Sequence, residues 1–172
     1  RDDVTEQEYI EMIRLKTSVL LACAAKMGAL LANAPQDDQD ALYGFGVNLG
    51  LAFQLQDDFL DVYGDFNTFV NKIGGDILCN KKTYMLINAM RLANEEQKEE
   101  LNHWIAAKNP DPKEKINAVT ALYDKIGIPE LAKNKIEYDF EKAMLCLDEV
   151  HVSKDRKALL HEMAVRLMHR NS

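Results

Sequence analysis

One stretch of the 172-residue sequence indicates the fold and the chemistry most directly: Gln54-Leu55-Gln56-Asp57-Asp58-Phe59-Leu60-Asp61. An α-helix advances by about 100° per residue, so Asp57 and Asp61 lie one turn apart on the same face. Asp58 flanks them, and Gln54 lies one turn earlier on that face. Like charges at this spacing repel each other, and a cation between them removes that cost. The stretch therefore predicts a helix that presents three carboxylates to a positively charged ligand.

Magnesium is the cation that best fits these ligands. Hard carboxylate oxygens suit Mg²⁺, which keeps most of its waters and links protein carboxylates to substrate phosphates. A solvated acidic face is the alternative, but the helix is otherwise strongly apolar, and clustered acids on a buried helix are costly. Downstream, Lys72 and Lys81 lie near glycines whose backbone N–H groups can approach phosphate. We expect both lysines to neutralise part of a diphosphate.

The order of these motifs resembles that of the trans-isoprenyl diphosphate synthases, also called polyprenyl synthetases. The second aspartate-rich motif of that family matches residues 53–61. Further elements match Lys-x-Gly-x-Asp at 72–76 and Asn80-Lys81, and a helical Lys-Thr pair upstream matches Lys16-Thr17. A lone Asp-Asp-x-x-Asp would be weak support, whereas the ordered set is specific.

The resemblance implies a Mg²⁺-dependent prenyltransferase that condenses an allylic diphosphate with isopentenyl diphosphate and releases pyrophosphate. Metal binding is implied for Asp57 and Asp61, with Asp58 as a third ligand or acting through a water. Phosphate contacts are implied for Lys16, Lys72 and Lys81. Orientation of the leaving group is implied for Thr17 and Gln54. No residue is required as a nucleophile in this scheme.

Half of the family's pattern is not found in this sequence. Family members carry a first aspartate-rich motif followed by an arginine pair, and the sequence contains neither. Residues 37–40 have the wrong spacing and follow Pro35, so they indicate a helix start. We therefore expect residues 1–172 to be the C-terminal part of one isoprenoid-synthase domain from a longer enzyme, inactive alone and homodimeric when intact. The product chain length is not encoded in these motifs.

Two alternatives remain open. The chain could be a non-catalytic partner subunit or helical interaction module of a prenyl synthase, because the first motif is missing. A terpene cyclase shares the fold, but cyclases usually carry an Asn/Ser/Glu-type triad at the second metal site in place of Asp-Asp-x-x-Asp. An upstream extension with the first motif would distinguish the enzyme from the partner subunit.

The whole sequence predicts an all-α helical bundle of the isoprenoid synthase type. Apolar residues recur at every third or fourth position, and strand signals are nearly absent. A capping box of Thr5 and Glu8 indicates the first helix start, and Tyr9 is expected to pack in the core or at its surface edge. Glycines 44, 46 and 50 would let another helix approach closely. Helices are expected over residues 5–33, 37–63, 81–93, 95–107, 112–126, 129–150 and 153–169, with a loop over 65–80.

Composition excludes several classes of protein. A net charge of −7 argues against binding to nucleic acid or to an anionic membrane surface. The longest apolar stretch, residues 18–34, is interrupted by Lys26 and Asn33, so it indicates a buried helix and no membrane span is expected. Three widely spaced cysteines favour neither a disulfide framework nor a zinc site. A cytoplasmic location is expected.

Overall fold

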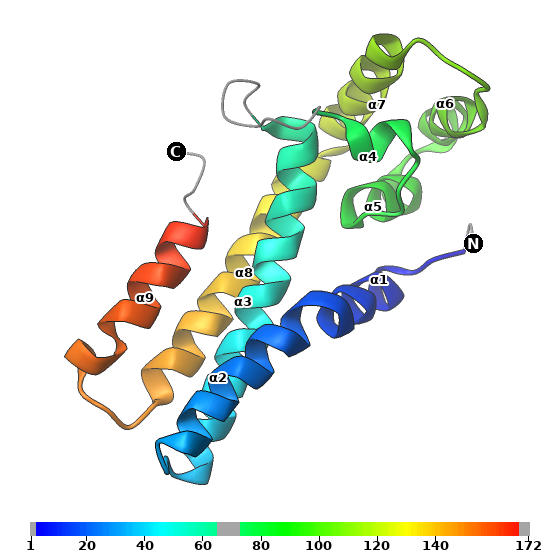
Figure 1. The fold of residues 1–172 in the computed structure, drawn as a ribbon. Coiled ribbons are helices and arrows are strands. Elements are labelled where there is room, and N and C mark those ends of the chain that lie inside the picture. Colours follow the sequence, from blue (N-terminus) through cyan, green and yellow to red (C-terminus); the bar gives the residue numbers. More distant parts are fainter. Residues whose placement is uncertain (1–2, 65–72, 169–172) are drawn as a thin grey trace. The chain divides into compact units, whose positions relative to one another are not determined.

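The computed structural model describes residues 3–64 and 73–168 of the chain (Figure 1). These residues form helices and no β-strand, which confirms the prediction of an all-α fold. The helices are α1 (Glu6–Ile13), α2 (Val19–Leu31), α3 (Gln36–Tyr63), α4 (Gly75–Leu78), α5 (Tyr84–Leu92), α6 (Glu95–Ala106), α7 (Pro112–Ile126), α8 (Ile128–Glu149) and α9 (Lys154–Met168). A π-helical turn, Arg14–Ser18, joins α1 to α2.

The chain divides into two compact units. Unit 1 consists of Arg1–Tyr9 and Asp57–Lys133, and unit 2 consists of Ile10–Gln56 and Asn134–Ser172. Each unit combines segments that are far apart in the sequence. The expectation of a single domain over residues 1–172 stays a prediction.

Most helix boundaries agree with the sequence signals. Glu8 N–H donates to Thr5 Oγ1 at 3.2 Å and Thr5 N–H donates to Glu8 Oε2 at 2.9 Å, which is the predicted capping box. Gly127 ends α7 with φ of 85°, a left-handed conformation that glycine adopts at little cost. Two expectations were wrong. The π-helical turn interrupts the helix expected over 5–33, and α4 forms within the loop expected over 65–80.

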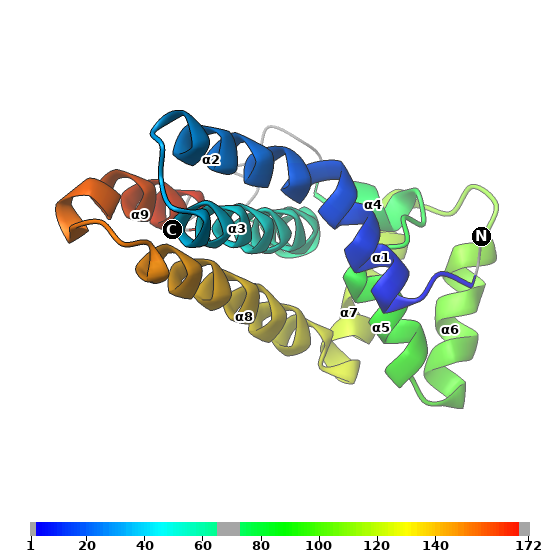
Figure 2. The ribbon, with the colours of Figure 1, turned by 90° about the horizontal axis from the view of Figure 1, so that it is seen from below.

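Unit 2 is built around α3, which lies between α2 and α8 (Figure 2). The glycines of α3 permit this packing as predicted, since a Cβ on Gly46 would lie 2.5 Å from Ala22 Cα and one on Gly50 would lie 2.6 Å from Ser18 Cα. Burial of apolar side chains from α3, α8 and α9 supplies the core. The fully buried residues of this core are Phe45, Leu49, Ala143, Leu147 and Ala164.

One apolar stripe of α2 stays exposed. Leu20, Met27 and Leu31 are spaced by seven and four residues, so they share a face of the helix. Their exposed fractions are 77%, 58% and 87%. The sequence had indicated a buried helix over residues 18–34, which is wrong for this face of α2.

Unit 1 is organised by α7, which packs against α4, α5 and α6. Asp111 caps α7, since its Oδ1 accepts from the N–H groups of Lys113 at 2.9 Å and Glu114 at 3.0 Å. At the start of α4, Gly74 has φ of 83°, and a Cβ there would lie 2.6 Å from Ile116 Cδ1. Glycine therefore satisfies both the backbone conformation and the close approach of α7.

A buried carboxylate in unit 2 makes the stability of the protein depend on pH. Asp139 is 2% exposed, its Oδ1 accepts from Lys135 Nζ at 2.8 Å, and burial raises its pKa above 3.8. The folded state then binds the proton more tightly than the unfolded state, so stability falls as pH rises through the folded pKa. We expect the unfolding free energy of wild type, relative to Asp139→Asn, to decline as the pH rises above about 4, the ordinary pKa of an aspartate. Denaturant titrations at a series of pH values measure it, and a difference that rises with pH contradicts the assignment.

Candidate functional site

The last turns of α3 carry the acidic residues singled out by the sequence. Asp58 is buried, with 2% of its surface exposed, whereas Asp57 and Asp61 are half-buried. The helix extends through all three positions, as the spacing predicted. The two carboxylates on the same face thus stay accessible while the flanking one is enclosed.

Asp58 is held by hydrogen bonds on both oxygens. Its Oδ1 accepts from Lys81 Nζ at 3.0 Å, and its Oδ2 accepts from the hydroxyl of Tyr9 on α1. Burial raises the pKa of Asp58, and the hydrogen bond from Tyr9 and the charge of Lys81 oppose that rise. Tyr9 is 2% exposed, which confirms the expectation that it packs in the core, and its hydroxyl adds a hydrogen bond that the sequence did not predict. Nothing in its local sequence marked the hydroxyl as a partner for a residue 49 positions away.

Lys81 bridges two carboxylates. Besides Asp58, its Nζ contacts Asp76 Oδ2 at 2.8 Å, and 43% of its side chain is exposed. Burial disfavours the ammonium, but the hydrogen bond to Asp76 and the charge of Asp58 outweigh it, so the pKa of Lys81 is raised. The ammonium is thus charged at neutral pH and reachable from solvent.

Asp61 joins the end of α3 to the start of α4. Its Oδ2 accepts from the backbone N–H of Asp76 at 2.8 Å, which supplies one of the acceptors that a helix start needs. A Cβ on Gly75 would lie 3.4 Å from Asp61 Oδ1, so α4 approaches this carboxylate closely. Burial raises the pKa of Asp61, and the N–H of Asp76 opposes the rise.

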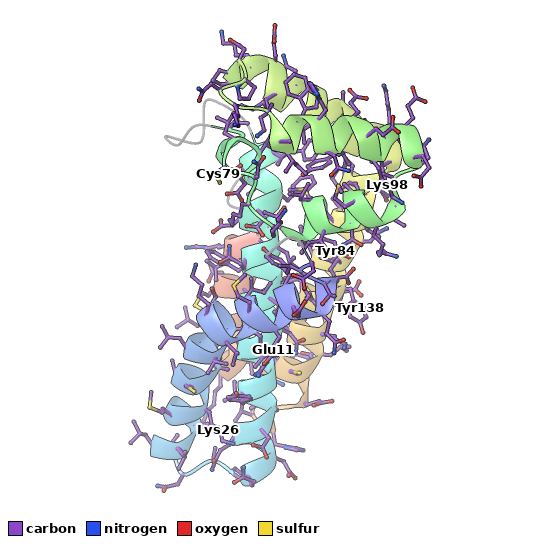
Figure 3. All side chains as sticks on the ribbon, turned by 90° about the vertical axis from the view of Figure 1, so that its right-hand side faces the viewer. Glu11, Lys26, Cys79, Tyr84, Lys98 and Tyr138 are labelled. Carbon is purple, nitrogen blue, oxygen red and sulfur yellow. The ribbon has the colours of Figure 1, made fainter. Side chains whose placement is uncertain are left out.

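The turn that carries Lys81 is braced from α6 and α7. Asn80, with φ of 53°, donates from Nδ2 to the carbonyl of Ile105 at 3.0 Å. Its Oδ1 accepts from Nζ of Lys115 at 2.6 Å, and Lys115 is only 3% exposed. Figure 3 labels Cys79 and Tyr84, which flank this turn on either side. The sequence marked the Asn-Lys pair but contained no signal for Lys115, whose partner lies 35 residues away.

The Lys16-Thr17 pair belongs to unit 2 and lies in the π-helical turn. The N–H of Val19 donates to the carbonyl of Arg14, five residues earlier, which defines the turn as π-helical. Thr17 Oγ1 donates to Gln54 Oε1 at 3.3 Å, so two of the predicted residues meet. Lys16 is exposed. Single π turns within α-helices are frequent at functional sites.

The described residues therefore contain two groups of predicted site residues. Unit 1 brings together Asp58, Asp61 and Lys81, and unit 2 joins Thr17 to Gln54. Lys72 lies outside the described residues. Within positions 3–64 and 73–168, no three His, Cys, Asp or Glu side chains gather as a group able to hold a metal ion by themselves. Among these residues, no helix is long and apolar enough to cross a membrane.

The fold and the carboxylate–lysine cluster define an all-α protein of the isoprenoid-synthase type. The family model described as polyprenyl synthetase matches residues 1–123. The chain belongs to the polyprenyl synthetase family, which confirms the resemblance found in its motifs.

Two curated relatives support this assignment. The short chain isoprenyl diphosphate synthase of Methanothermobacter thermautotrophicus is 33% identical over 166 residues, which cover 96% of this chain and 47% of the relative. The geranylgeranyl diphosphate synthase of Sulfolobus acidocaldarius is 32% identical over 155 residues, covering 90% of this chain and 46% of the relative. The chain thus spans about half the length of these curated relatives.

Solved structures share the fold. A crystal structure of geranylgeranyl pyrophosphate synthase matches with a TM-score of 0.89 and 38% identity, over 100% of this chain and 54% of that chain. A geranylgeranyl pyrophosphate synthase from Corynebacterium glutamicum, complexed with isoprenyl diphosphate and magnesium, matches with a TM-score of 0.86 and 26% identity, over 98% of this chain and 48% of that chain. These matches confirm the predicted isoprenoid-synthase type of helical fold.

Proposed function

We propose that the protein containing this chain is a trans-prenyltransferase that condenses an allylic diphosphate with isopentenyl diphosphate and releases pyrophosphate. Membership of the polyprenyl synthetase family supports the reaction class. The observation that carries the proposal is the contact of Lys81 with Asp58 and Asp76 at the end of α3, because it places a charged, partly exposed ammonium beside an acidic helix face. We further propose that the intact enzyme is a homodimer in the cytoplasm.

The charge of this cluster supports the proposal that diphosphate binds together with a divalent cation. Asp58, Asp61 and Asp76 together carry more negative charge than Lys81 offsets. A diphosphate alone would therefore be repelled at this face. Mg²⁺ commonly uses one or two protein carboxylates and completes its coordination with water and substrate phosphate.

Asp57 and Asp61 fit Mg²⁺ when water and substrate phosphate supply its remaining ligands. Asp57 and Asp61 lie one turn apart on α3 and are both half-buried, so two carboxylates share one face of the helix and are partly accessible. Both oxygens of Asp58 accept hydrogen bonds from protein groups, which favours the alternative that Asp58 acts through a water. Bound there, Mg²⁺ would supply positive charge to the leaving diphosphate.

The residues of this chain act on the departing diphosphate. Cleavage of the carbon–oxygen bond transfers negative charge to that group, and fixed positive charge stabilises the transition state more than the ground state. We propose that Lys16, Lys72 and Lys81 bind phosphate oxygens. We propose that Thr17 and Gln54, which are joined by a hydrogen bond, orient the leaving group. The carbocation formed is then attacked by the double bond of isopentenyl diphosphate, and a proton is lost.

Calorimetric titration of the chain with pyrophosphate, with and without Mg²⁺, tests the proposal. We expect binding only with Mg²⁺. Lys81→Ala should weaken it by about 10- to 100-fold, the loss of one hydrogen bond to a charged group. It should also lower stability, because Asp58 is buried beside Lys81.

Lys98→Ala is the matched control. Lys98 lies in the same unit, contacts Glu95 at 3.5 Å and has 38% of its side chain exposed (Figure 3). Its removal should leave affinity unchanged. If the isolated chain does not bind, the pair of variants is compared in the enzyme that contains it, by the KM for the allylic substrate. Equal values for both variants contradict the proposed role of Lys81.

A further inference from the structure

Tyr9 is fixed at the base of the acidic cluster in unit 1. The hydroxyl donates to Asp58 Oδ2, and the residue is 2% exposed. The capping box of Thr5 and Glu8 fixes the start of α1 directly before it. A buried tyrosine hydroxyl normally finds a polar partner. Here that partner is a residue of the aspartate-rich motif.

Tyr9 and Lys81 bind different oxygens of the Asp58 carboxylate. A carboxylate has two oxygens, and with Oδ2 occupied by the hydroxyl, Lys81 is bonded through Oδ1 at 3.0 Å. The ammonium has three N–H groups, of which Asp58 and Asp76 accept two. The side chain remains 43% exposed. Lys81 is therefore held at a defined place on the surface of the cluster.

We propose that Tyr9 is a positioning residue for Lys81 and acts through Asp58. Without the hydroxyl, the buried carboxylate loses one of its two partners, and its remaining interactions concentrate on Lys81. The ammonium is then drawn away from Asp76 and from the position at which a diphosphate oxygen would arrive. This inference rests on the proposed function of Lys81 in binding diphosphate.

Tyr9→Phe tests the proposal, with Tyr63→Phe as the matched control. Tyr63 lies in the same unit, and its hydroxyl donates to an exposed carboxylate, Asp124 Oδ1, at 2.8 Å. Both variants thus delete one hydroxyl–carboxylate bond. The first readout is the side-chain ¹⁵N signal of Lys81, assigned by its loss in Lys81→Arg. The second is the affinity for pyrophosphate with Mg²⁺.

We expect Tyr9→Phe to shift and broaden the Lys81 signal and to weaken pyrophosphate binding by about 3- to 10-fold, the usual range for one hydrogen bond. Tyr63→Phe should change neither readout. A folded Tyr9→Phe variant with an unchanged Lys81 signal overturns the proposal. A shifted signal with unchanged affinity overturns the link to diphosphate binding.

Failure of the proposed function is distinguishable from failure of this inference. If the wild-type chain binds no pyrophosphate, the proposed function of this cluster in the isolated chain fails, and the Lys81 signal alone decides whether Tyr9 positions it. If Tyr9→Phe does not fold, fluorotyrosine at position 9 replaces it, since the hydroxyl is retained and becomes a stronger donor. The Lys81 signal should then shift, and an unchanged signal overturns the proposal.

Discussion

Replacing Asp57 by alanine in the proposed prenyltransferase is expected to lower kcat by at least about 100-fold, the scale of losing one preorganised electrostatic group. Asp57 is half-buried near the end of α3, one turn from Asp61. Under the proposed function, removing it would deprive Mg²⁺ of one carboxylate ligand beside the leaving diphosphate. Because the loss concerns the transition state, kcat should fall more than the affinity for the allylic substrate.

Asp37→Ala provides the control for this measurement. Asp37 lies in the first turn of the same helix and is exposed. Its removal takes away a favourable charge at a helix N-terminus, which typically costs only about 0.3–1 kcal/mol of stability. Steady-state kinetics and thermal unfolding should be recorded on both variants. Near-wild-type turnover of a folded Asp57→Ala enzyme would rule out the metal assignment.

A large loss of stability is expected when a side chain is added where α2 packs on α3 within unit 2. Gly46→Ala places a Cβ 2.5 Å from Ala22 Cα and 2.7 Å from its backbone nitrogen. Neither atom belongs to a flexible side chain, so a helix backbone has to move. We expect a loss of about 1–3 kcal/mol in unfolding free energy, typical of overpacking.

Gly28→Ala adds the same methyl group to a helix but is expected to raise the unfolding free energy. Gly28 lies inside α2, and a Cβ there meets nothing within 4 Å. Alanine should therefore stabilise the helix by up to about 1 kcal/mol through its higher helix propensity. Denaturant unfolding of both variants measures the difference. Equal effects of the two substitutions would show that α2 and α3 do not pack as described.

Local sequence signals predicted the features of this fold that depend on a few neighbouring residues. The Thr5–Glu8 capping box and the Gly127 helix end both arise from contacts within one turn, so residue type and spacing suffice. The same holds for the shared face of Asp57 and Asp61. The predicted roles of these carboxylates rest on the family motif.

Long-range contacts could not be predicted in this way. Tyr9 meets Asp58 across 49 residues and Lys115 meets Asn80 across 35, so their pairing depends on how the helices of unit 1 fold together. The π-helical turn at Arg14–Ser18 also escaped detection, because one extra residue in a turn barely changes helical periodicity. The family motif was enough to predict a function. It did not identify Tyr9 and Lys115, which contact residues of the motif.

The exposed stripe of Leu20, Met27 and Leu31 on α2 affects how solutions of this chain should behave. Contiguous apolar surface of this kind promotes association between molecules. Association follows mass action, so its extent rises with protein concentration. An affinity for pyrophosphate measured at one concentration would then describe a mixture of species. A dilution series is needed to obtain the value that belongs to the monomer.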